Sequence, residues 1–165
     1  MAYNYIEYEV SDGIGRVTLN RPEKLNALSQ ELQDELMDCM RAADDDPEVR
    51  VITLRGNGRA FCAGYDITPP GEQTPEEEAR SKEMRENIRW DMHRMKKTPA
   101  RWTELFNMDK PIIAGVHGYC VAGGTDMAMH CDIIIAADDA QIGFPAVRSM
   151  GTPPTHMWTY MVGPQ

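Results

Sequence analysis

Alternating hydrophobic and polar positions near the N-terminus predict two β-strands joined by a tight turn. The alternation covers residues 5–10 and 14–19, and Asp12-Gly13 lies between them. An Asp-Gly pair favours the left-handed backbone of a two-residue hairpin turn. We therefore expect the chain to begin with a β-hairpin.

Apolar residues at helical spacing predict an amphipathic helix from Ser29 to about residue 43. Ser29 is placed to cap its N-terminus, because a serine side chain can accept a hydrogen bond from an amide of the first turn. The expected buried stripe comprises Leu32, Leu36, Met40 and Ala43.

A second helix is predicted over residues 75–97. Thr74 precedes it as N-cap, Pro75 suits the first helical position, and Glu77 completes a capping box. A further short helix is expected over residues 99–107, after the end of the first.

Short apolar runs complete the pattern. They predict strands at residues 51–54, 112–116 and 132–136, with a loop at 56–64 and a last helix at 155–162. This order of strands and helices is typical of the α/β class. The chain has 165 residues, 42% of them hydrophobic, which is enough for one domain with its own core over residues 1–165.

Charge and composition exclude several classes of function. The formal net charge of −9 argues against a nucleic-acid-binding surface. No apolar run has the length of a membrane span, and the N-terminal residues lack a signal-peptide pattern, so we expect a cytoplasmic protein. The cysteines lack metal-ligand spacing and predict no metal site; they are Cys39, Cys62, Cys120 and Cys131.

The segment 110–132 carries the pattern of an anion site. An apolar strand runs into Ala122-Gly123-Gly124, which opens a short helix. Glycine lets a ligand approach the backbone, and the first turn of a helix has amides without intrahelical partners. Asp126 lies three residues after Gly123 on the same helical face. Such an element can hold a developing oxyanion beside a carboxylate.

A second loop of small residues follows the buried strand at residues 51–54. It contains Ala63-Gly64, and by itself this pair is typical of an ordinary turn. The two loops together have a more specific meaning. The segments AFCAGYDI and KPIIAGVHGYCVAGGTDMAMHCDIIIAADDAQIGFP, with IGRVTLNRPEKLNALS before them, closely resemble the crotonase (enoyl-CoA hydratase/isomerase) superfamily over about residues 6–163.

The resemblance implies a spiral of ββα units that binds an acyl-CoA thioester. It places the two oxyanion-hole amides on Ala63 and Gly123, and each such donor contributes typically about 3 kcal/mol to the transition state. No cofactor is implied beyond the CoA that the substrate carries. The implied substrate-binding residues are Lys24, Ala27, Leu28, Ala63, Gly64, Tyr65, Asp66 and Gly123. Arg21, Lys24 and Arg59 are either phosphate contacts or solvated surface residues.

The resemblance also exposes a departure in the acid/base groups. Hydratases of this family generally use two glutamates; Asp126 occupies the first position, and Ala146 occupies the second, after Gly143-Phe144-Pro145. Asp126 is therefore either the acid/base group or only a favourable charge in the first turn of its helix. An enoyl-CoA hydratase is expected, and an isomerase, a hydrolase or a non-catalytic acyl-CoA-binding protein remain alternatives.

Other polar residues carry weaker signals. Tyr65, Tyr119, Arg148 and His156 are minor candidates for the acyl pocket, whereas His117 and His93 are expected to be a packed and a solvated histidine. Family members continue where this sequence ends, so the C-terminal helices that build a homotrimer or hexamer are expected to be missing. Without them, an apolar surface that they normally bury would be exposed.

Overall fold

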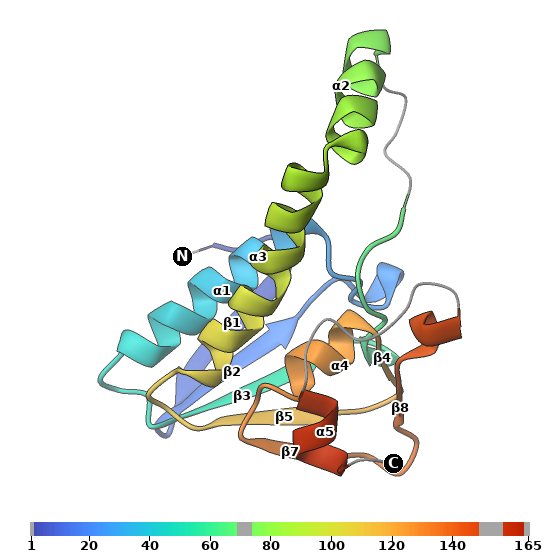
Figure 1. The fold of residues 1–165 in the computed structure, drawn as a ribbon. Helices are drawn as coiled ribbons and strands as arrows, with labels where there is room; N and C mark the ends of the chain where they lie inside the picture. The colour runs from blue at the N-terminus through green and yellow to red at the C-terminus, as the bar shows by residue number, and fades with distance from the viewer. Residues whose placement is uncertain (1, 69–73, 149–156, 164–165) are drawn as a thin grey trace.

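A computed structural model describes residues 2–68, 74–148 and 157–163 (Figure 1). Its main sheet has five strands in the order β1-β2-β3-β5-β7. These strands are β1 (Ile6–Ser11), β2 (Ile14–Leu19), β3 (Val51–Gly56), β5 (Ile112–Val116) and β7 (Ile133–Ala136). Only β1 and β2 pair antiparallel; the other neighbours are parallel.

The predicted hairpin is confirmed. Ser11 pairs with Ile14, and both turn residues, Asp12 and Gly13, have positive φ angles of 57° and 78°. This is the backbone conformation that a two-residue turn between twisted strands requires.

The first predicted helix is confirmed as α1 (Gln30–Asp45). The Ser29 hydroxyl accepts a hydrogen bond from the Leu32 amide at 3.2 Å, as an N-cap does. The expected apolar stripe is completely buried in the core, at Leu32, Leu36, Met40 and Ala43.

Three further strands form a second sheet in the order β4-β6-β8, with parallel neighbours. They are β4 (Ala60–Cys62), β6 (Tyr119–Val121) and β8 (Gln141–Gly143). Each follows a strand of the main sheet, so that β3–β4, β5–β6 and β7–β8 repeat one unit, and α4 (Gly123–Ala128) follows the second pair. This confirms the predicted spiral of ββα units. The prediction of a loop over residues 56–64 was wrong, because a three-residue strand has no readable periodicity.

The predicted helix over residues 75–97 is two helices, α2 (Pro75–Glu86) and α3 (Ile88–Phe106). The capping box is confirmed, since the Thr74 amide donates to the Glu77 carboxylate at 2.8 Å and the Glu77 amide to the Thr74 hydroxyl at 3.3 Å. Asn87 interrupts the helix: its side chain accepts from the Arg89 amide at 3.0 Å and so caps α3.

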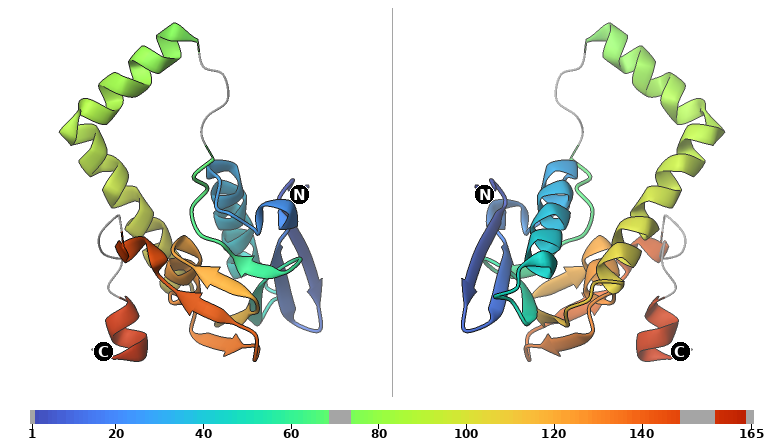
Figure 2. Two further views of the ribbon diagram at one scale, coloured as in Figure 1. Left: turned by 90° about the vertical axis from the view of Figure 1, so that its right-hand side faces the viewer. Right: turned by 90° about the vertical axis from the view of Figure 1, so that its left-hand side faces the viewer.

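The boundary expected near Pro99 is absent, because α3 continues through that proline. Two residues of its last turns, Trp102 and Leu105, are buried in the core, and this packing stabilises the part of the helix that follows Pro99. α3 lies beside α1, where Arg101 donates to Gln33 at 2.6 Å, whereas α2 points away from the rest of the molecule (Figure 2).

At the C-terminal end, the described part of the last predicted helix is α5 (Met157–Val162); residues 155–156 lie outside the described residues. None of the described helices has the length and apolarity needed to span a bilayer. Large apolar side chains are exposed along this end of the fold, at Ile133, Ile135, Ile142, Val147, Tyr160, Met161 and Val162.

One buried asparagine connects the N-terminal segment to the start of the second sheet. The Asn26 side-chain amide donates to Ala60 O at 2.9 Å and to Phe61 O at 3.2 Å, and its oxygen accepts from the Arg21 amide at 2.9 Å. Asn26 itself has a left-handed φ of 55°.

We expect Asn26→Ala to lower the free energy of unfolding by about 3 kcal/mol, because buried carbonyls lose their donor. Urea unfolding measures this loss. Asn4→Ala, at an exposed position, is the control and should change stability by less than about 0.5 kcal/mol. Asn26→Gly separates the two causes: if it restored stability, left-handed strain and not the lost hydrogen bonds would explain the effect.

Candidate active site

The segment after β6 folds as the sequence predicts. Ala122 turns the chain with φ 49° and ψ −119°, and α4 begins directly at Gly123. Every residue of this short helix is buried. Its first amides therefore lie in the interior of the fold, next to the end of β4.

The loop after β4 lies against this turn. An isolated parallel bridge joins Leu28 to Tyr65, in which the Leu28 amide donates to Gly64 O at 2.8 Å and the Asp66 amide to Leu28 O at 3.1 Å. A Cβ atom on Gly64 would lie only 3.3 Å from the Gly123 nitrogen. The structure therefore brings together the two loops that the sequence analysis singled out.

The amides of the β4 loop are not equivalent. The Ala63 amide donates to Leu25 O at 2.9 Å, so the fold already uses the hydrogen atom that the sequence analysis assigned to an oxyanion hole. By contrast, the amides of Tyr65 and Gly123 make no hydrogen bond within the part of the chain that the structure describes. The geometry therefore argues against Ala63 and favours Tyr65 as the donor on this loop.

Asp126 is completely buried, one helical turn from Gly123. Its carboxylate oxygen Oδ2 accepts a hydrogen bond from the Tyr65 hydroxyl at 3.0 Å. That hydroxyl accepts in turn from the Trp102 indole N–H at 3.0 Å. Burial raises the pKa of Tyr65, and the charge of Asp126 raises this pKa further, so the phenol keeps its proton at neutral pH.

Trp102 is the member of this site that sequence reasoning missed. The signal that existed was its spacing from Leu105 along one face of a helix, which indicates core packing and no chemistry. His130 is another buried neighbour: its Nδ1 lies 2.6 Å from the Asp126 carbonyl oxygen, and the Phe106 ring packs edge-on against the imidazole.

The predicted CoA-binding segment at residues 24–28 lies beside the same loop. Leu28 is buried, and its Cδ1 would lie 2.9 Å from a Cβ atom on Gly123. Asp66 forms an ion pair with Arg21 at 2.5 Å, and Arg21 also donates to Ala27 O at 3.1 Å. The Arg21 guanidinium is therefore already paired with a carboxylate, so it is less available to bind a phosphate group.

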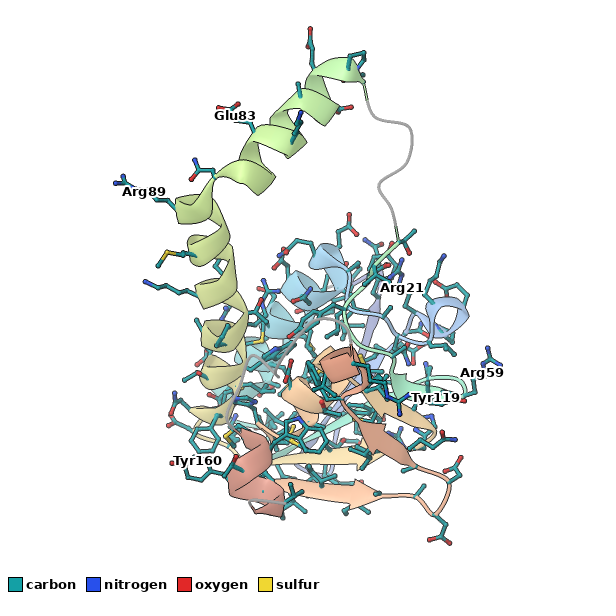
Figure 3. The ribbon with its side chains drawn as sticks, turned by 45° about the vertical axis from the view of Figure 1, so that its right-hand side comes forward. Arg21, Arg59, Glu83, Arg89, Tyr119 and Tyr160 are labelled. Atoms are coloured by element: carbon teal, nitrogen blue, oxygen red, sulfur yellow. The ribbon has the colours of Figure 1, made fainter. Side chains whose placement is uncertain are left out.

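Two basic side chains near this segment are solvent-exposed, those of Lys24 and Arg59. Arg59 points outward from the turn that leads into β4 (Figure 3). Among the minor candidates, Tyr119 is exposed on β6, and His117 is half-buried, with Nε2 2.9 Å from Gly58 O. Arg148 is exposed at the end of the 3₁₀ helix Pro145–Arg148, which also contains Ala146. His156 and the His93 side chain lie outside the described residues.

The four cysteines are buried free thiols. Burial raises the pKa of Cys62 to about 12, and its Sγ lies 3.2 Å from Asn26 O, as in a plain core thiol. Within the described ranges, no three His, Cys, Asp or Glu side chains come together in a way that could hold a metal ion.

Comparison with known proteins shows the family of this chain. The family model for enoyl-CoA hydratase/isomerase matches residues 9–165. The probable enoyl-CoA hydratase echA8 of Mycobacterium tuberculosis is 36% identical over 148 residues, which are 90% of this chain and 52% of that protein. Hydroxycinnamoyl-CoA hydratase-lyase of Pseudomonas fluorescens is 36% identical over 92% of this chain and 52% of its own length.

Solved structures show the same relationship. An enoyl-CoA hydratase from Mycobacterium smegmatis superimposes with a TM-score of 0.85 at 38% identity, covering 99% of this chain and 57% of that one. An enoyl-CoA hydratase/isomerase from Xanthobacter autotrophicus Py2 gives a TM-score of 0.83 at 32% identity, with 99% and 57% covered. The chain belongs to the enoyl-CoA hydratase/isomerase family, within the crotonase superfamily. It spans about half the length of the curated relatives it matches.

We expect Gly123→Ala to destabilise the protein by about 1–3 kcal/mol, the usual range for overpacking. The added Cβ would lie 2.8 Å from Cε2 of Tyr65 and 2.9 Å from Cδ1 of Leu28. Urea unfolding measures the effect. Gly143→Ala is the matched control, since a Cβ there meets no atom of the described residues within 4 Å. Equal stabilities of the two variants would show that the contact is absent in solution.

The Asp66 carboxyl gives a pH-dependent prediction. Hydrogen bonds from Thr68, and then from Arg21, hold its pKa well below the usual range. Its stabilising contribution is therefore present above the unfolded pKa of about 3.9 and is lost as the pH falls below it. We expect Asp66→Asn to be less stable than the unchanged protein at pH 7, by a margin that shrinks below about pH 4. A margin that stayed constant from pH 7 to pH 3 would contradict the lowered pKa of Asp66.

Proposed function

We propose that this protein processes acyl-CoA thioesters, with the amides of Gly123 and Tyr65 as its oxyanion hole. The observation that supports the proposal is the contact between the loop after β4 and the first turn of α4, two segments whose Tyr65 and Gly123 amides make no hydrogen bond within the described residues. Chemistry next to a thioester builds negative charge on its carbonyl oxygen. Two fixed N–H groups stabilise that charge more strongly in the transition state than in the ground state.

Asp126 is the proposed acid/base group. Its buried carboxylate lies on α4, one turn beyond the proposed donor at Gly123, so a thioester held there would present its α and β carbons near it. Proton transfer by a positioned carboxylate typically contributes about 10²–10⁴-fold to a rate. The CoA part of the substrate is proposed to bind along Leu28 and the loop after β4.

Hydration of an enoyl-CoA is the first reaction to test, because the named relatives are hydratases. Hydration needs a water activated at one carbon and a proton delivered at its neighbour, and Ala146 provides no group for the second task. Double-bond isomerisation is the second candidate, because one carboxylate can remove a proton from one carbon and return it to another. A homotrimeric or hexameric assembly and a cytoplasmic location stay predictions.

We expect Asp126→Asn to lower kcat for the enoyl-CoA substrate by at least about 100-fold while KM changes by less than about threefold. The isosteric amide keeps the packing but cannot accept the substrate proton. A spectrophotometric assay over a panel of enoyl-CoA esters measures turnover, and chromatography separates hydrated from isomerised products. Full turnover by the variant would remove Asp126 from the mechanism.

An acyl-CoA panel also separates catalysis from simple binding. Submicromolar binding of several acyl-CoA esters, measured by calorimetry, with no turnover of any of them would favour the non-catalytic alternative.

A further inference from the structure

The Tyr65 side chain connects two elements that are distant in the sequence. Its hydroxyl lies 3.0 Å from the Trp102 indole nitrogen on α3 and 3.0 Å from Oδ2 of Asp126 on α4. An indole N–H can only donate, so the phenol oxygen accepts from Trp102 and turns its own hydrogen toward the carboxylate. The direction of the two hydrogen bonds is therefore fixed: the indole donates to the phenol, and the phenol donates to the carboxylate.

The ring of the same residue touches the proposed oxyanion hole. A Cβ on Gly123 would lie 2.8 Å from Cε2 and 2.9 Å from Cζ of Tyr65, so the ring lies directly against the glycine. The backbone amide of Tyr65 is the second proposed donor. One residue thus contacts the carboxylate through its hydroxyl and Gly123 through its ring.

We propose that the Tyr65 side chain is a positioning residue for the acid/base step. Anchored by Trp102, its hydroxyl holds the Asp126 carboxylate at a fixed place relative to the amides that are proposed to bind the thioester oxygen. This inference rests on the proposed function.

The physical reason is the accuracy that proton transfer demands. An aspartate has one methylene fewer than the glutamate of the family, so its carboxylate reaches less far and its orientation matters more. A hydrogen bond from a phenol that is itself held by a second hydrogen bond restricts the rotation of the carboxylate. Loss of this fixed carboxylate orientation should reduce kcat by about 10- to 100-fold, the effect that a small misplacement of reacting groups has. Substrate affinity should change little, because loss of the hydroxyl alone leaves the Tyr65 ring and the backbone of the loop after β4 in place.

The test compares two Tyr→Phe variants of the purified protein, each of which removes one Tyr–Asp hydrogen bond. Tyr65→Phe keeps the ring and removes both the bond to Asp126 and the bond from Trp102. Tyr3→Phe removes a surface bond of the same length, 3.0 Å to Asp38, and serves as the control. We expect Tyr65→Phe to lower kcat by about 10- to 100-fold with KM within about threefold of the unchanged protein. The control should retain its kcat.

A double-mutant cycle distinguishes positioning from a general structural effect. If Tyr65 acts through Asp126, adding Tyr65→Phe to Asp126→Asn should lower kcat no further. A structural effect would lower kcat equally in both backgrounds, and that result would overturn the inference, as would an unchanged kcat in Tyr65→Phe alone.

The cycle also separates this inference from the proposed function. If the unchanged protein turns over no acyl-CoA ester, the proposed function fails and the inference fails with it. If the unchanged protein is active and only the variant comparison fails, the proposed function stands and the role of Tyr65 does not.

Discussion

The candidate site depends on one close approach between two stretches of backbone. Gly64 lies so near the Gly123 nitrogen that a Cβ atom would stand 3.3 Å from it, and the parallel bridge between Leu28 and Tyr65 fixes the loop in that place. Glycine is needed at Gly64 for its left-handed φ of 96° as well as for the contact. The Tyr65 ring against Gly123 and the amides of both residues lie around this approach.

The second sheet explains how distant segments reach the same place. Three strands of the main sheet, β3, β5 and β7, are each followed by a three-residue strand of the smaller sheet. Because β4 and β6 pair with each other, their ends lie side by side. Asn26 supports the start of β4 from the N-terminal side through its bonds to Ala60 and Phe61. The site is thus supported by buried backbone contacts, which suit groups that must not move during a reaction.

Local signals in the sequence predicted much of this fold, and tertiary contacts decided the rest. Asp12-Gly13 and Ser29 gave a hairpin and a helix start because their effects act within a few residues. The strands of the second sheet left no pattern, since three residues cannot show a period. The hydrogen bond from the Ala63 amide was also not predictable. Its acceptor, Leu25 O, lies in a turn where Leu25 and Asn26 have left-handed backbone angles, and the turn contains no glycine that would have indicated them. The juxtaposition of the two loops was predictable only through the family resemblance.

The use of a main-chain amide at Tyr65 has a consequence for how such a site can change over evolutionary time. Any substitution except proline keeps the N–H, so mutation at this codon leaves the proposed hydrogen-bond donor to the oxyanion in place. The side chain, in contrast, plays no part in supplying that N–H, and in this chain it is a phenol that donates to Asp126. At this one position, the backbone N–H keeps its function through substitution, whereas the function of the side chain changes with the residue. Lineages that share the donor can acquire different partners for the carboxylate by a single codon change.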